Sequence, residues 1–100
     1  MNLSNLPGGD LILPGVEALK RGETDAVGAL LIAIASTRLS NAGLMFPKDN
    51  LAKDPELTLY ARLKTERTDP YPYYNALLDS LNSFCNALEQ RKRYENNNKE

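Results

Sequence analysis

The C-terminal third of the chain contains the stretch that decides the fold, YNALLDSLNSFCNAL at residues 74–88. Its apolar residues recur at intervals of three and four, the spacing of one face of an α-helix. They are Tyr74, Leu77, Leu78, Leu81, Phe84, Cys85 and Leu88. The preceding pair Asp69-Pro70 is typical of a helix start, and Pro72 is tolerated only in a first turn. The sequence therefore predicts a long amphipathic helix that begins near residue 70.

An apolar stretch nearer the N-terminus predicts a second core helix over Ala26–Asn41, capped by Thr24 or Asp25 and ended by Gly43. Residues 26–35 are apolar on nearly every side, so we expect this helix to be buried on more than one side. Ten helical residues span only about 15 Å, half the thickness of a bilayer core. This pattern favours a buried helix over a membrane span.

Two shorter helices complete the expected fold. Pro14–Arg21 begins with a proline in the first turn, and Pro55–Thr65 carries a leucine pair four residues apart. Alternating strand patterns are scarce. We therefore predict an all-α fold, a single domain of about four helices over residues 1–94, with the second and fourth helices forming the core. Residues 95–100 contain no apolar side chain, and we expect them to form a disordered polar tail.

Composition excludes several functional classes. Lys and Arg total 12 against 13 Asp and Glu, for a net charge of −1, whereas nucleic-acid binders usually show a basic excess. The chain has no His and one Cys, so the commonest general base near neutral pH is missing and no internal disulfide can form. The first residues lack the basic and apolar regions of a signal peptide. We expect a cytoplasmic protein with no membrane partner.

We expect no catalytic, cofactor-binding or metal-ligating residue. Cys85 lies within the apolar stripe and far from the start of its helix, which predicts a buried structural thiol and not a nucleophile. Gly8-Gly9 precedes a helix and could seat an anion, but it lacks the lysine of a phosphate-binding loop, and a turn is the simpler interpretation. The carboxylates are scattered, and none belongs to a Glu-x-x-His pair.

A row of polar and aromatic residues on the predicted fourth helix is the candidate interface. Tyrosine combines a rigid apolar ring with a polar tip and is enriched in binding surfaces, whereas asparagine is a poor helix former whose repeated use is notable. The alternatives are packing of the tyrosines over neighbouring helix ends and a simple solvated face. The candidate residues are Tyr71, Tyr73, Asn75, Asp79, Asn82 and Asn86.

Arg38 is the one charged residue between Asp25 and Lys48. It is either an exposed residue near a helix C-terminus or a partly buried arginine paired with a carboxylate or with the anion of a ligand. We therefore treat Arg38 as the candidate anion contact.

These observations predict a non-catalytic helical protein–protein interaction module that forms a homodimer or binds another protein. Two strongly apolar helices in so short a chain leave surface for a second copy to cover. Alternatively, Leu11-Ile12-Leu13 and Leu44-Met45-Phe46 complete the core of a monomer. The alternative function is an accessory nucleic-acid or anion-binding protein that uses Arg62, Lys64, Arg67 and the triplet Arg91-Lys92-Arg93. An enzyme with a Tyr, Arg and Asp site is the third possibility.

Overall fold

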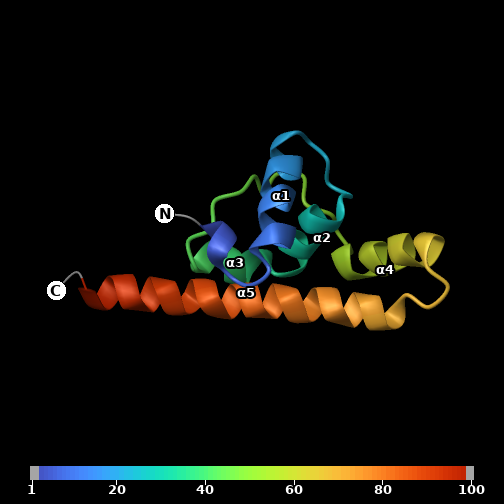
Figure 1. Cartoon of the computed structure of the whole chain (residues 1–100). Coiled ribbons are helices and arrows are strands. Elements are labelled where there is room, and N and C mark those ends of the chain that lie inside the picture. Colours follow the sequence, from blue (N-terminus) through green and yellow to red (C-terminus); the bar gives the residue numbers. More distant parts are fainter. Residues whose placement is uncertain (1–2, 99–100) are drawn as a thin grey trace.

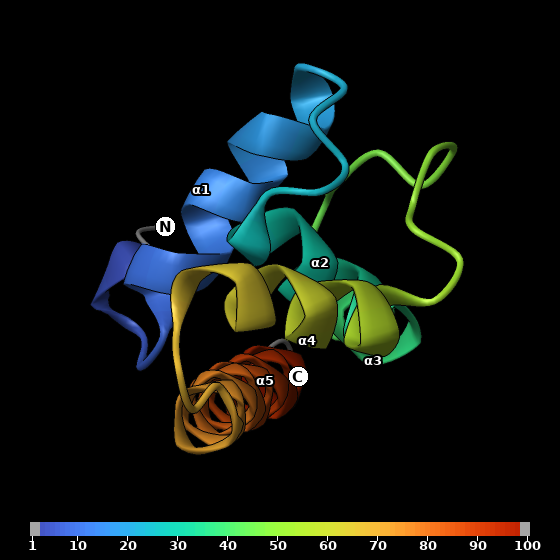
Figure 2. The same cartoon turned by 90° about the vertical axis from the view of Figure 1, so that its right-hand side faces the viewer.

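The computed structural model describes residues 3–98, and the regular secondary structure within that range consists only of helices. In chain order they are the 3-10 helix η1 (Leu3–Asn5), α1 (Gly9–Lys20), α2 (Val27–Ile34), α3 (Ser36–Asn41), α4 (Pro55–Glu66) and α5 (Tyr71–Asn98). Figure 1 shows α5 as a long bar beneath the other helices, with α4 over its N-terminal half. Figure 2 looks along α5 and shows α2 enclosed between α1, α4 and α5. The predicted all-α fold is confirmed.

The amphipathic stripe forms α5 as predicted and binds that helix to the rest of the chain. Its 28 residues correspond to a length of about 42 Å, which accounts for most of the 51 Å long axis of the molecule. Leu77, Leu81, Phe84 and Leu88 are buried. The helix continues to Asn98, so residues 95–98 of the expected polar tail extend α5, and its last two residues lie outside the described range.

The α2 helix is the centre of the core, as its composition predicts. Its residues Ala29 to Ile32 have no solvent-exposed surface. The expected pairing with the C-terminal helix is borne out in part, because α2 packs more extensively against α1 and α4 than against α5.

Two glycines allow α1 and α2 to cross with their backbones in contact. A Cβ atom on Gly15 would lie 2.3 Å from the carbonyl carbon of Gly28, and one on Gly28 would lie 2.6 Å from the carbonyl oxygen of Leu11. No side chain fits at either position. Gly28 interrupts the apolar stretch of residues 26–35, and its role is to admit α1.

The predicted start of the first helix at Pro14 is wrong, because α1 begins five residues earlier, at Gly9. Gly8 has φ +78°, a conformation that glycine adopts without strain, and its carbonyl accepts hydrogen bonds from Leu11 and Ile12. A Cβ on Gly8 would also lie 2.6 Å from the carbonyl oxygen of Ser80 on α5. Pro14 lies inside α1 with its ring exposed, where it removes one helical N–H donor.

The predicted helix over Ala26–Asn41 is interrupted at Ala35, which has φ −112° and ψ 29° and separates α2 from α3. The helix itself begins at Val27, after Ala26, so neither Thr24 nor Asp25 caps it. At the break the sequence changes from apolar residues to Ser36-Thr37, whose hydroxyls compete for backbone hydrogen bonds. The new direction of α3 buries Leu39 and brings Arg38 to α5.

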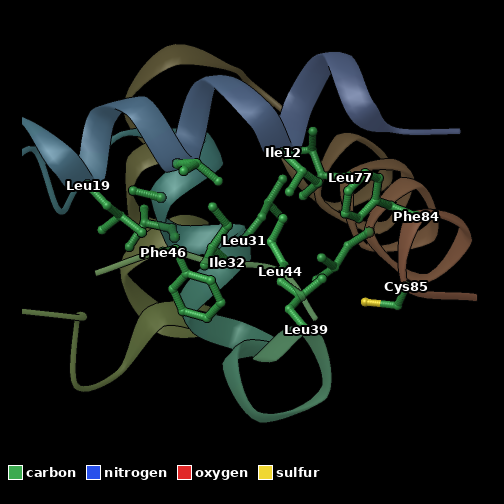
Figure 3. Packing of buried hydrophobic residues seen from close by; sticks show 14 of the residues in the cluster. Ile12, Leu19, Leu31, Ile32, Leu39, Leu44, Phe46, Leu77, Phe84 and Cys85 are labelled. Atoms are coloured by element: carbon green, nitrogen blue, oxygen red, sulfur yellow. The ribbon is translucent and has the colours of Figure 1, made fainter. Parts of the chain in front are cut away.

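The segment after α3 completes the core within one chain. Leu44 and Phe46 are buried, as is Ile12 of α1, and all three belong to the single cluster that Figure 3 shows. Met45, between two buried residues, is 83% exposed. The monomer alternative therefore accounts for the α5 stripe and for α2 without a second copy. Across the described residues, no helix combines the length and apolar character needed to cross a bilayer.

Candidate functional site

Arg38 of α3 makes a two-point ion pair with Glu89 of α5. The Arg38 Nε atom lies 2.7 Å from Glu89 Oε2, and Nη2 lies 3.0 Å from Oε1. This parallel geometry is the strong form of an arginine–carboxylate contact. The side chains are 37% and 30% exposed, so solvent screens the attraction between the two charges in part.

Two asparagines of α5 complete the shell around the guanidinium. Arg38 Nη1 donates to Asn82 Oδ1 at 3.3 Å, and Nη2 donates to Asn86 Oδ1. With Glu89, the three residues follow one face of α5 at intervals of four and three. Arg38 thereby makes four hydrogen bonds to α5, against the five N–H donors of a guanidinium.

The ion pair shifts the titration of its members. The hydrogen bond to Glu89 raises the pKa of Arg38 above its ordinary value, and the same bond lowers the pKa of Glu89. Burial raises the pKa of the Cys85 thiol, and the nearby positive charge of Arg38 only partly opposes that effect. Cys85 is buried, as the sequence predicts, and this environment favours the unreactive thiol.

This network divides the candidate interface row. Asn82 and Asn86 face Arg38 of the same chain, while Asn75 and Asp79 are exposed further along α5. The sequence analysis left open whether Arg38 pairs with a carboxylate or with a ligand anion. In this structure its partner is a carboxylate of the chain itself, and a contact with a ligand anion stays a prediction.

The tyrosines lie at the other end of α5 and pack in part over α4. Tyr74 meets Tyr60 edge to face, with ring centroids 5.4 Å apart, and its pKa is raised by burial and by the nearby Glu56. The Arg67 guanidinium lies 3.6 Å from the centroid of the Tyr73 ring. Tyr71 is 59% exposed. Only Tyr71 of this group is therefore largely open to a partner.

A groove of about 410 Å³ lies where the α2–α3 break, the first turn of α4 and the middle of α5 meet. Its floor is apolar and its rim carries opposite charges, the combination usual in binding pockets. The lining residues are Ile34, Ala35, Ser36, Thr37, Arg38, Glu56, Leu78, Leu81 and Asn82. Sequence reasoning missed this groove because the break at Ala35 was not predicted.

The basic residues proposed as a nucleic-acid contact form two separate groups. Arg62 donates to the main-chain oxygen of Asp25 at 2.6 Å, on α4. Lys92 donates to the main-chain oxygen of Asn41, and Arg91 lies 3.9 Å from Glu95. The first group lies on α4, which packs against α5 at Tyr74. The second group begins at Arg91, about 25 Å further along α5. No continuous basic stripe joins the two groups in the described part of the chain.

The Gly8-Gly9 turn, considered above as a seat for an anion, has a structural role. The Gly8 turn is packed against α5. Among residues 3–98, no cluster of three or more His, Cys, Asp or Glu side chains is placed to hold a metal ion.

Comparison of the chain with protein-family models, with curated proteins and with solved structures found no match.

Proposed function

We propose that this protein is a non-enzymatic helical interaction module that binds a second copy of itself through the groove between α3, α4 and α5. The observation that carries the proposal is the apolar floor of this groove. Ile34 and Leu78 pack against the core but stay partly open to solvent. Such a floor between polar walls suits an apolar side chain from another protein.

A second copy can supply that side chain. Leu57 is 72% exposed and directly follows Glu56, which lines the groove on α4. In a twofold dimer the same surface meets itself, so a protruding side chain and its pocket must lie on one patch. Leu57 adjoins a groove residue in the sequence, and the proposed dimer places its side chain on that patch.

The wall of the groove is preorganised by the Arg38–Glu89 pair, since Arg38 lines the groove and is fixed by four hydrogen bonds to α5. A fixed wall lowers the entropy cost of association. The reason for expecting self-association thus moves from the α5 stripe, which the monomer buries, to this groove.

Sedimentation equilibrium over a micromolar concentration series tests the proposal. We expect a mass near twice 11.1 kDa at the upper end, with dissociation on dilution. A single 11.1 kDa species throughout would reject self-association.

A matched pair of variants tests the surface. Leu57→Ser and Met45→Ser each remove one exposed apolar side chain, but only Leu57 is next in sequence to a residue that lines the groove. We expect Leu57→Ser to weaken the dimer and Met45→Ser to leave its dissociation constant unchanged. Equal dissociation constants for the two variants would place the interface elsewhere.

A further inference from the structure

A second pocket of about 330 Å³ lies between α3 and the segment that follows it, and it shares Ser36 and Thr37 with the groove. We name it the hydroxyl pocket. It is lined by Ser36, Thr37, Ser40, Asn41, Lys48 and Leu51. Its volume falls at the lower end of the range of about 300–1,000 Å³ for small-molecule sites.

The pocket arises from the register of α3 and from the folding back of the next segment. Residues 36, 37, 40 and 41 share one face of a helix. Burial of Leu44 and Phe46 returns the chain toward α3, and Lys48 then faces that helix. The Lys48 Nζ atom donates to Ser40 Oγ at 2.5 Å and lies 5.7 Å from the centroid of the Phe46 ring.

The charge of the pocket is positive. Lys48 is its one charged lining residue, and it forms no ion pair with another residue in the described range. A second ammonium group adjoins the C-terminal end of α3, where Lys92 donates to the main-chain oxygen of Asn41. Glu89, the acidic residue of α5 that contacts α3, has its charge paired with that of Arg38.

We infer that the hydroxyl pocket binds a tetrahedral oxyanion, the phosphoryl group of a small molecule. A lysine ammonium acts as a point charge with three donors, and hydroxyl groups rotate to donate in several directions. Together they suit the oxygens of a phosphoryl group, whereas a planar carboxylate is better matched by the fork of an arginine. Leu51 provides an apolar wall for the organic part of the ligand.

Ser36 and Thr37 line both the groove and the hydroxyl pocket, whereas Ser40, Lys48 and Leu51 line only the pocket. Lys48 and Ser40 therefore test this assignment separately from the proposed dimer. The test is a titration of the isotope-labelled protein with inorganic phosphate, followed by amide chemical shifts at constant ionic strength. Saturable shifts over the millimolar range at residues 36–41 and 48 are expected. Acetate at the same concentrations should give weaker binding.

Two variants and one control complete the test. Lys48→Gln should weaken phosphate binding by at least about tenfold, the effect of losing one charge-assisted hydrogen bond. Ser40→Ala, which keeps the charge, should weaken it by a smaller factor. Lys53→Gln removes an exposed lysine that does not line the pocket and should bind phosphate as the wild type does.

Circular dichroism establishes that each variant is folded. The assignment is overturned by the absence of saturable shifts, by shifts confined to residues 91–93, by undiminished binding in Lys48→Gln, or by acetate binding as tightly as phosphate.

Discussion

Arg38 and Glu89 are 51 positions apart in the chain, yet their side chains meet at 2.7 Å and 3.0 Å in a parallel ion pair. The contact exists because the chain changes direction at Ala35, between α2 and α3. It joins the six-residue helix α3, which is too short to be stable alone, to the longest helix of the fold. The pair therefore stabilises the position of α3 and, with it, one wall of the groove.

Removal of either member of the pair should destabilise the protein, and Arg38→Gln should cost more because Arg38 also donates to Asn82 and Asn86. We expect Arg38→Gln and Glu89→Gln each to lower the melting temperature by on the order of a few degrees. The double variant should lose much less than the sum of the two, because the second substitution removes a group that has already lost its partner. Thermal unfolding of the four proteins measures this coupling, and strictly additive losses would show that the pair contributes nothing to stability.

The same pair predicts a dependence of stability on acid. Because Arg38 lowers the pKa of Glu89 in the folded state below its ordinary value of 4.5, the folded state binds this proton less readily than the unfolded state does. The stabilisation is present above the ordinary pKa and is lost as the pH falls through the folded pKa. Urea unfolding between pH 7 and pH 3 should therefore show that the free energies of unfolding of the wild type and of Glu89→Gln converge as the pH falls. A constant difference across that range would contradict this assignment.

The glycine contact between α1 and α2 predicts a large effect from a single methyl group. In Gly15→Ala the new Cβ would meet the main chain of Gly28, which cannot move aside as a side chain can. We expect a loss of at least about 1–3 kcal/mol in the free energy of unfolding, the usual cost of overpacking. Gly22→Ala is the control, since its Cβ meets nothing within 4 Å and only the positive φ of +82° opposes it. Urea unfolding should rank Gly15→Ala as the less stable variant, and the reverse order would argue against the close crossing.

Periodicity and helix boundary signals were sufficient to predict most of the architecture. The stripe of α5 depends on local spacing. The pairs Asp54-Pro55 and Asp69-Pro70 mark the starts of α4 and α5 through local backbone preferences. These features can therefore be predicted from a single sequence. Asp54 stands at the N-cap of α4 but makes no side-chain capping bond.

The features that the sequence did not reveal depend on contacts between distant residues. The break at Ala35 and the crossing of Gly15 over Gly28 become visible only once helices are placed side by side. Arg38 stood out because it was isolated among apolar residues. Its partner Glu89 continues the polar row of Asn82 and Asn86 on the C-terminal helix, but that spacing alone does not say that the row meets Arg38. The groove arises from the break at Ala35, whereas the hydroxyl pocket depends on the return of residues 48–51 to α3, which is also a contact between separate segments.

The orientation of α5 is tested by two adjacent positions. Leu81 is buried in the middle of the stripe, whereas its neighbour Asn82 is exposed and makes only a 3.3 Å contact with Arg38. Leu81→Ala should lower the free energy of unfolding by roughly 2–5 kcal/mol, and Asn82→Ala should change it little. Chemical denaturation measures both, and similar losses would mean that the helix is rotated from the orientation described.

The chemistry of Cys85 gives a test of the core that requires no substitution. The thiol is buried on the inner face of α5, and burial raises its pKa, so the folded protein holds it in the form that reacts slowly with disulfide reagents. We expect a chromogenic aromatic disulfide to modify Cys85 at pH 8 many times more slowly in the native protein than in urea. Modification of the native protein requires opening of the α5 packing. The reaction should therefore be slower in variants with a larger free energy of unfolding. Leu81→Ala should therefore react faster than Asn82→Ala, and rapid native modification at the rate of the unfolded chain would show that α5 does not bury this face.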